Sequence, residues 1–200
     1  RRHDGGLRIL LDGTRELARD HVLVRLLFIN ALSFGLLMAY LSAAPFVLRN
    51  VLGMGTVVYT AVFGLCGATV TVTIAVAASL VRRFSQARQV RVGLIAGLVV
   101  DTVFAGVCLT WLREPVTGPE RMPLLVAVVA LFLAHVACLG LSMGNAPALA
   151  LDRTGRWAGT GSALLGFLQF VVGGLVSPLV GLTGEASGVA FGVVIVAVGA

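Results

Sequence analysis

Long hydrophobic stretches, separated by short polar segments, dominate the pattern of this chain. One of them extends from residue 158 to 182 without a charged side chain. As a helix it would be about 37 Å long, which is enough to cross a hydrocarbon core of about 30 Å. Six helical spans are predicted, at residues 22–41, 56–80, 92–112, 123–146, 158–182 and 188–200. The expected fold class is therefore an all-α membrane protein built as a six-helix transmembrane bundle.

Turn-forming and polar residues set the predicted boundaries of the first span. Residues 1–21 are polar, and Thr14 is expected to cap a short helix that runs directly into this span. Pro45 and the glycines after it predict a loop once the span has ended at Leu41.

The later boundaries follow from charge and from proline. Residues 81–91 form the densest charge run and are predicted as a loop, and Asn145 and Pro147 are predicted to mark the end of the fourth span. The thirteen residues from Gly188 onward would reach only about 20 Å, so the sixth segment is expected to be either a distorted element or a helix cut short.

The composition excludes a water-soluble domain. Hydrophobic residues make up 58% and charged residues 12% of the 200 residues, whereas a soluble surface needs about twice that charge. All fifteen basic residues are Arg, and the net charge of +6 raises the question of nucleic-acid binding. Because the Arg side chains lie in short segments between spans, the expected partner is the lipid bilayer and not a nucleic acid.

The distribution of Arg predicts the orientation in the membrane. Residues 1–21, 81–91 and 151–156 together carry eleven Arg, whereas the other three connections carry three. Arg25, at the start of the first span, can snorkel to the Arg-rich side. The excess indicates a cytoplasmic N-terminus, and six crossings would return the C-terminus to the same side.

Two ionisable side chains lie in the middle of predicted spans. Asp101 is halfway along the third span, where an ionised group costs about 2.5–3.5 kcal/mol, so a functional role is the default interpretation. Burial disfavours the charged form of a carboxyl, which suits reversible protonation, whereas an interhelical hydrogen bond or a water-filled face is the alternative. No intramembrane base is an obvious partner for this carboxyl. His135, midway along the fourth span, is expected to be neutral and bonded to a neighbouring helix, with a proton or substrate contact as the alternative.

Uncharged polar groups and thiols complete the set of unusual side chains inside the spans. Asn30 and Ser33 in the first span, and Gln169 in the fifth, either line a pore or bridge helices, and interhelical hydrogen bonds are the favoured interpretation. Three cysteines in hydrophobic runs, without a CxxC motif, are interpreted as small packing residues: Cys66, Cys108 and Cys138.

The motifs of catalysis and of metal binding are incomplete. Residues 140–144 match G-x-S-x-G, which in rhomboid intramembrane proteases supplies a serine that pairs with a histidine on the sixth span. Here His135 precedes Ser142 by seven residues on one predicted helix, about 10 Å along its axis, and the sixth segment contains no histidine. The sequence also has no HExxH, Walker A or haem-ligand pattern. We therefore expect no enzyme activity, no metal site and no cofactor.

Three segments resemble the major facilitator superfamily, and within it the drug:proton antiporters of the bicyclomycin-resistance (Bcr/CflA) type. Residues 39–54, AYLSAAPFVLRNVLGM, are similar to the segment that leaves the seventh span of that family. Residues 80–94, LVRRFSQARQVRVGL, resemble the basic loop between spans eight and nine. Residues 158–182, AGTGSALLGFLQFVVGGLVSPLVGL, resemble the eleventh span and are the most specific of the three.

The resemblance implies that the chain is the second six-helix half of a twelve-span protein. Residues 1–21 would then end the cytoplasmic linker between the halves, and Ala200 would lie inside the twelfth span. A helix-packing pattern occupies the place related by pseudo-symmetry to the antiporter motif of span five: Gly173, Gly174, Pro178 and Gly181. The basic loop would gate the cytoplasmic side through Arg82, Arg83, Arg88 and Arg91.

The function that the resemblance implies is secondary active transport by alternating access, specifically proton-coupled efflux of drugs or amphipathic small molecules across a bacterial plasma membrane. The residues expected to line the substrate or proton pathway are Asn30, Asp101, His135 and Gln169. The expected partners are the N-terminal six-span half, a small-molecule substrate and protons. A stand-alone six-span scaffold or partner-binding protein is the alternative, and a rhomboid-like protease is a less favoured one.

Overall fold

The computed structural model describes the backbone of residues 6–182 and 187–200, and the side chains of these ranges from residue 10 onward. Five of the described helical segments are long and apolar enough to cross a membrane, and α7 is a shorter apolar helix. This confirms the predicted all-α membrane class. The elements are α1 (Gly6–Leu17), α2 (His21–Pro45), a π-helical turn (Phe46–Val51), α3 (Thr56–Leu80), α4 (Gln86–Thr110), α5 (Arg121–Asp152), a 3-10 turn (Gly155–Trp157), α6 (Ala158–Leu179) and α7 (Val189–Gly199).

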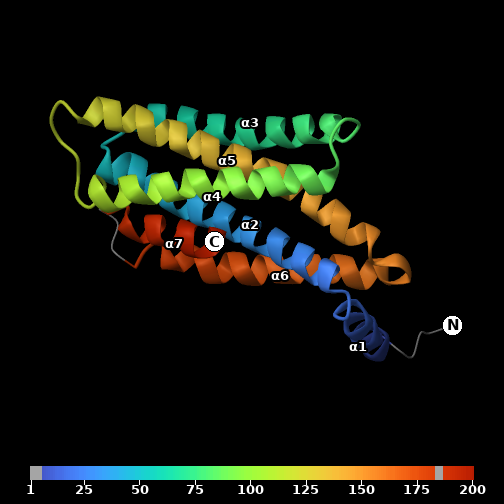
Figure 1. The fold of residues 1–200 in the computed structure, drawn as a ribbon. Helices are drawn as coiled ribbons and strands as arrows, with labels where there is room; N and C mark the ends of the chain where they lie inside the picture. The colour runs from blue at the N-terminus through green and yellow to red at the C-terminus, as the bar shows by residue number, and fades with distance from the viewer. Residues whose placement is uncertain (1–5, 183–186) are drawn as a thin grey trace.

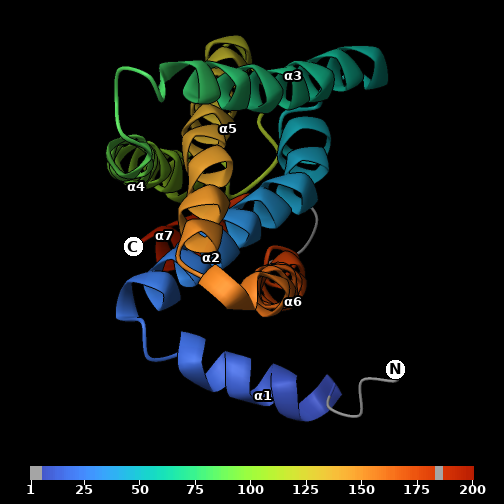
Figure 2. The same ribbon diagram turned by 90° about the vertical axis from the view of Figure 1, so that its right-hand side faces the viewer.

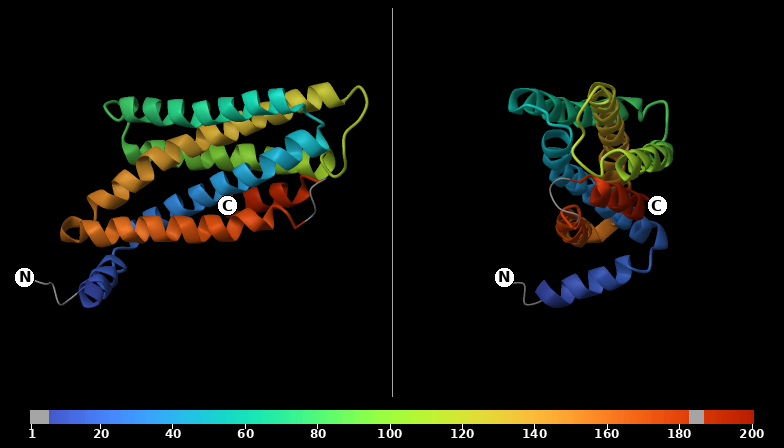
Figure 3. Two further views of the ribbon diagram at one scale, coloured as in Figure 1. Left: turned by 180° about the vertical axis from the view of Figure 1, so that it is seen from behind. Right: turned by 90° about the vertical axis from the view of Figure 1, so that its left-hand side faces the viewer.

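The helix α2 runs through the middle of the bundle, where it contacts α5, α6 and α7 (Figure 1). The helix α4 packs between α5 and α7, and α3 packs on the outer side of α5. One end of the bundle carries α1, the α3–α4 turn and the α5–α6 turn, as the view from behind also shows (Figure 3). We call it the Arg-rich end, because the described side chains there include Arg15, Arg19, Arg82, Arg83, Arg88, Arg91, Arg153 and Arg156.

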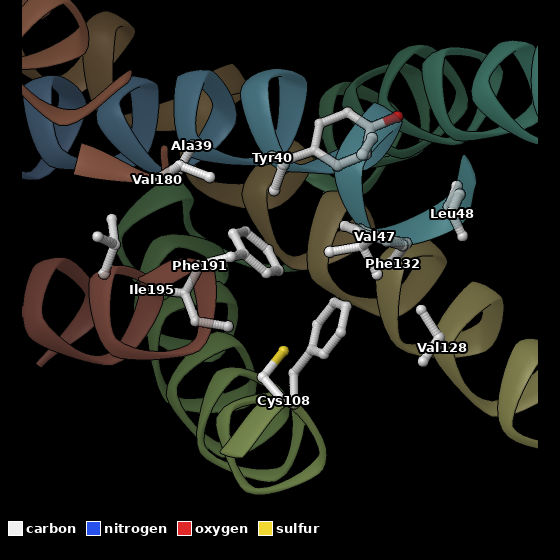
Figure 4. Close-up of a cluster of buried hydrophobic side chains, with 14 of the residues drawn as sticks. Ala39, Tyr40, Val47, Leu48, Cys108, Val128, Phe132, Val180, Phe191 and Ile195 are labelled. Atoms are coloured by element: carbon white, nitrogen blue, oxygen red, sulfur yellow. The ribbon is translucent and has the colours of Figure 1, made fainter. Parts of the chain in front are cut away.

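An aromatic core joins α2, α4, α5 and α7. The ring of Phe132 lies edge-on to that of Phe104, with centroids 4.8 Å apart, and Phe104 is likewise edge-on to Phe191 at 5.2 Å. Tyr40 of α2 meets Phe132 at 5.4 Å. Figure 4 shows Phe132 and Phe191 with Cys108 among the buried aliphatic side chains. Since lipid tails are as apolar as these side chains, the helices associate through close packing rather than through a hydrophobic effect.

The predicted loop after Leu41 is wrong, because the helix continues. The helix α2 extends to Pro45 and passes into the π-helical turn Phe46–Val51. The chain turns only at Gly53, which has a φ of +61°. Arg121, at the start of α5, donates hydrogen bonds to the carbonyl oxygens of Leu52 (2.7 Å from Nε) and Gly53. These bonds satisfy carbonyls that the helix end leaves free.

The predicted end of the fourth span at Pro147 is also wrong, since α5 runs on to Asp152. Proline removes one helical hydrogen bond, and transmembrane helices tolerate this loss where neighbouring groups compensate. The side-chain amide of Asn145 donates to the carbonyl of Leu141 (2.9 Å) and to Oε1 of Gln89 on α4 (3.3 Å). This residue therefore ties two helices together instead of ending one.

The predicted direct run of the first helix into the first span is wrong, and Thr14 does not cap that helix. This residue lies inside α1, and its hydroxyl donates to the carbonyl of Leu10 (2.8 Å). Asp20 is the N-cap of α2, and its Oδ1 accepts hydrogen bonds from the backbone N–H groups of Val22 and Leu23. The break before Asp20 lets α1 lie across the spans at the Arg-rich end (Figure 2).

An ion pair and a close contact hold α1 against the turn before α6, and a second ion pair joins the start of α2 to the end of α5. Oε2 of Glu16 lies 2.7 Å from Arg156, and Oδ2 of Asp20 lies 2.8 Å from Arg153. The Arg156 guanidinium lowers the pKa of Glu16, and the Arg153 guanidinium lowers the pKa of Asp20. A Cβ atom on Gly13 would come within 2.7 Å of the Trp157 ring, so glycine permits this approach.

Candidate functional site

Asp101 and His135 form a buried pair between two antiparallel neighbours, α4 and α5. The Oδ1 atom of Asp101 lies 2.6 Å from Nδ1 of His135. The two residues are 1% and 0% exposed. Asp101 is the sixteenth of 25 residues in α4, and His135 is the fifteenth of 32 in α5, so the pair lies deep within the spans. Intramembrane ionisable residues that pair in this way mark functional sites by default.

The expectation that Asp101 has no intramembrane base as a partner is wrong. The expected bond from His135 to a neighbouring helix is present, and its partner is this carboxyl. The sequence contained a usable signal. Because α4 and α5 follow one another in the chain, they are expected to be antiparallel neighbours, and Asp101 and His135 lie about 14 Å and 21 Å from the connected helix ends.

The second ring nitrogen of His135 has no hydrogen-bond partner among the described residues. The ring stands roughly perpendicular to that of Phe191, with centroids 6.4 Å apart. The contact between Nδ1 and the carboxyl is a hydrogen bond whose donor depends on the histidine tautomer. Nε2 is the ring atom left available for a further donor or acceptor.

A cavity of about 310 Å³ lies beside the pair, between α2, α4, α5 and α7. Most of its lining is aliphatic. Its polar side chains are Asp101, His135, Ser33 of α2 and Ser142 of α5. Ser33 and Ser142 are each 2% exposed, so these hydroxyls are buried from the outer surface. The arrangement offers a polar inner wall within an apolar pocket, as small-molecule and ion sites do.

A serine-protease arrangement is not formed, although Ser142 and His135 line the same cavity. Both residues belong to α5, seven positions apart, which corresponds to about 10 Å along the helix. The free Nε2 atom of His135 has no hydroxyl within hydrogen-bond distance in the described chain. A general base must approach its nucleophile closely, so this geometry does not support nucleophilic catalysis.

Asn30 and Gln169 belong to a second polar contact, between the parallel helices α2 and α6. Nδ2 of Asn30 donates to Oε1 of Gln169 (3.3 Å), which confirms the predicted interhelical bond. Further along the same interface, the hydroxyl groups of Ser42 and Ser177 lie 2.6 Å apart. The four predicted pathway residues therefore form two separate pairs. Asn30 and Gln169 do not line the cavity beside Asp101.

The glycine pattern of α6 divides into a packed residue and exposed ones. A Cβ atom on Gly173 would come within 2.9 Å of Phe34 and Met38 on α2, so this position is needed for close packing. Gly174 has open space around its Cα atom. Pro178 lies in the last turn of α6, and Gly181 lies beyond the end of that helix. The structure gives a packing role to Gly173 alone among these three glycines.

The predicted basic loop is shorter than expected, because α4 begins at Gln86 under a cap from Ser85. Its four Arg side chains are exposed: Arg82 and Arg83 lie in the turn, and Arg88 and Arg91 lie on α4. The guanidinium of Arg88 lies over the ring of Phe84, 5.2 Å from its centroid. Gln89 donates to the carbonyl of Phe84 (3.2 Å) and thereby fixes the turn.

Sequence reasoning missed three groups with clear structural roles: the Gln89–Asn145 bond, Arg121 and the two acid–Arg pairs of Glu16 and Asp20. Each connects elements far apart in the sequence, so no local pattern indicates it. Within residues 6–182 and 187–200, no three His, Cys, Asp or Glu side chains gather as metal ligands would.

The chain was compared with known proteins. The sequence profile described as Major Facilitator Superfamily matches residues 3–178. The chain belongs to the major facilitator superfamily. It is similar to an uncharacterized MFS-type transporter, YdgK, of Bacillus subtilis (strain 168), with 28% identity over 159 residues. That match covers 78% of this chain but only 35% of the relative's own length. No solved structure matches the chain.

Membership of the major facilitator superfamily makes this a multi-pass membrane protein and points to transport rather than to catalysis. The family match extends from α1 through nearly all of α6, so it includes both polar pairs. The pairs lie within four of the described helices, α2 and α6 for one and α4 and α5 for the other.

Proposed function

We propose that this major facilitator chain takes part in proton-coupled efflux of drugs or other amphipathic small molecules. The observation that carries the proposal is the buried contact between Asp101 and His135, at 2.6 Å, beside a cavity of about 310 Å³. A buried acid and base at this depth are costly for a membrane helix and are explained by proton movement. The resemblance of residues 39–54, 80–94 and 158–182 to Bcr/CflA-type antiporters supports the drug:proton class.

The proposed mechanism is alternating access. The six-helix half described here rocks against an N-terminal six-span half, and the solute site opens in turn to each side of the membrane. Asn30 and Gln169 lie at one polar contact and Asp101 and His135 at the other. In the proposed pathway, Asp101 and His135 carry the protons. The mostly aliphatic side chains around this pair suit an amphipathic solute.

The Arg-rich turn between α3 and α4 is the proposed cytoplasmic gate. Arg82, Arg83, Arg88 and Arg91 are exposed there, so they are available to the membrane surface and to the other half. The excess of Arg at this end supports a cytoplasmic N-terminus in the plasma membrane of a bacterium. The bonds of Gln89 and Asn145 keep the turn in place while the halves move.

The test uses the complete gene product in proteoliposomes with ethidium as an amphipathic probe. We expect ethidium movement to drive a proton flux, measured with a trapped pH-sensitive dye. Asp101→Asn and His135→Gln should abolish this flux while the protein remains monodisperse. The matched control is Asp152→Asn, which removes an exposed carboxylate at the Arg-rich end and should leave the flux unchanged.

Two results would contradict the proposal at different points. If ethidium drives no proton flux with the unsubstituted protein, drug:proton exchange is wrong for this probe class. If Asp101→Asn retains full coupling, the pair is not the proton site.

A further inference from the structure

We propose that α5 bends at Pro147 during transport, so that the Arg-rich end opens between two separately packed groups of helix ends. The first group contains the end of α3, the start of α4 and residues 121–146 of α5. The second contains α1, the starts of α2 and α6, and residues 148–152 of α5. This inference rests on the proposed alternating access for its role, and it adds a bend inside this half to the rocking of two halves. Its test measures distances within the protein, so the two can fail separately.

Before Pro147, α5 is held to α4 by a buried amide pair and by a close approach of the two helices. Nδ2 of Asn145 donates to Oε1 of Gln89 (3.3 Å), and both residues are buried. Four residues further along α4, a Cβ atom on Gly93 would lie 2.9 Å from Cβ of Leu141 on α5. Only glycine fits between the helices at this position, so the two backbones approach closely there.

The same part of α5 is held to α3 through two glycines. A Cβ atom on Gly140 would lie 2.8 Å from Cβ of Thr73, and one on Gly144 would lie 3.4 Å from the side chain of Ile74. Residues 140–144, which match G-x-S-x-G, therefore provide the small-xxx-small spacing that lets membrane helices pack closely. Contacts on two sides leave this part of α5 little freedom to move relative to α3 and α4.

After Pro147, α5 has different neighbours. Ala150 is completely buried in a second hydrophobic cluster, separate from the aromatic core. Three residues later, Arg153 pairs with Asp20, the N-cap of α2, at 2.8 Å. Within the described ranges, α3 and α4 contribute no residue to this cluster, so the end of α5 packs with α1, α2 and α6. The other buried members of the cluster are Leu17, Leu23, Leu27 and Leu165.

Pro147 lies between these two sets of contacts, two residues after Asn145 and three before Ala150. Its ring nitrogen carries no hydrogen, so the helical bond to the carbonyl of Met143 is missing, and the ring crowds that carbonyl. Sharp bends in helices occur at such positions. The backbone of α5 is therefore weakened at the point where the packing partners of the helix change.

A bend at this point would move the two polar pairs relative to each other. Asp101 and His135 belong to α4 and to the part of α5 before Pro147, whereas Asn30 and Gln169 belong to α2 and α6. The α3–α4 turn and the α5–α6 turn, which lie at separate places of the Arg-rich end in Figure 1, would move apart. A hinge needs only a few residues to absorb the change in backbone angles, so the aromatic core can stay intact.

Spin labels on the complete protein in proteoliposomes measure this opening. The cross pair joins Val22→Cys on α2 to Ala87→Cys on α4, and the internal pair joins Val22→Cys to Asp152→Cys at the end of α5. All three positions are exposed, and the native cysteines are first replaced by alanine. In samples frozen during ethidium transport, we expect two populations of distances for the cross pair and one for the internal pair.

Pro147→Ala tests the hinge directly, because alanine restores the missing backbone N–H. We expect this variant to lose one of the two cross-pair populations and to transport ethidium more slowly, while its thermal stability stays the same or rises. Pro123→Ala is the matched control on the same helix. Pro123 lies in the first turn of α5, where the backbone N–H groups have no helical partner in any case, so both populations should remain.

A single cross-pair distance in a protein that transports ethidium would overturn the proposal, because the Arg-rich end would then not open between the groups. Two populations that persist in Pro147→Ala would overturn it as well. An internal pair that varies as much as the cross pair would show that the end of α5 does not follow α2.

The hinge can also be tested if ethidium drives no proton flux and the proposed drug:proton exchange is wrong. The cross-pair distances are then compared in the resting protein. Two populations that Pro147→Ala reduces to one would support the hinge, and a single population in every variant would overturn it.

Discussion

The Nδ1 atom of His135 lies 2.6 Å from Oδ1 of Asp101, and neither side chain is accessible at the surface of the bundle. An ionisable side chain inside a membrane helix is unfavourable on its own. The contact between these two residues offsets part of that free-energy cost. For such a buried acid–base contact, the loss of stability on removing one partner differs from the loss on removing both.

Removal of one member of this pair should therefore destabilise the protein more than removal of both. His135→Phe leaves the Asp101 carboxyl without its partner, and breaking a buried pair in this way costs about 3–5 kcal/mol. The double variant Asp101→Leu/His135→Phe replaces both groups by apolar ones and should recover much of that loss. Unfolding in mixed detergent micelles measures the difference. A double variant less stable than His135→Phe would show that the pair is not the source of the effect.

The packing of α2 against α6 gives a second prediction with an internal control. In Gly173→Ala the new Cβ atom would meet Phe34 and Met38 at 2.9 Å, so we expect a loss of about 1–3 kcal/mol from overpacking. In Gly174→Ala the new atom meets nothing within 4 Å, and alanine favours the helix, so stability should be unchanged or slightly higher. Thermal unfolding of the two variants side by side tests this. Equal transition temperatures would contradict the assigned contact.

The hydrogen bond from Asn30 to Gln169 should contribute modestly to stability. Polar contacts between membrane helices average about 0.6 kcal/mol in double-mutant cycles, because the separated helices also find partners. We expect a coupling energy of that order between Asn30→Ala and Gln169→Ala. The cycle requires unfolding free energies for the two single variants and the double variant. A coupling energy indistinguishable from zero would mean that the two amides act independently.

The attachment of α1 should weaken in acid. The pKa of Glu16 on α1 is lowered by Arg156, and the pKa of Asp20, in the link between α1 and α2, is lowered by Arg153. Each carboxylate therefore favours its ion-paired state at pH values above its ordinary pKa of about 4. As the pH falls through the lowered values, both groups become protonated and this contribution is lost. Both pairs are exposed, so high salt should have the same effect.

Hydrogen exchange of α1 followed by mass spectrometry measures this attachment. We expect protection at neutral pH and low salt, and weaker protection in acid or in Arg156→Gln, after correction for the intrinsic pH dependence of exchange. Arg113→Gln changes an Arg at the opposite end of the bundle and is the control. Protection that is independent of pH and of Arg156 would show that packing around Gly13 alone holds the helix.

The sequence by itself determined the class of the protein and the approximate extent of its spans. A continuous apolar stretch has to be a membrane helix, because unpaired backbone groups are costly in lipid, and the predicted span 56–80 coincides with α3. The helix ends predicted near Pro45 and Pro147 were wrong, because both helices continue through or past the proline. Asn30, Asp101, His135 and Gln169 could all be named in advance as unusual polar residues within apolar segments.

Only the tertiary structure decided which of these residues meet. A helix that is apolar on every side carries no pattern to set its rotation, so the sequence does not reveal which face of α4 turns toward α5. That rotation joins Asp101 to His135, separates them from Asn30 and Gln169, and leaves the cavity between four helices. The physical reason is that close packing in lipid depends on the shapes of facing surfaces, such as the space beside Gly173, and shape complementarity arises only when the helices are in contact.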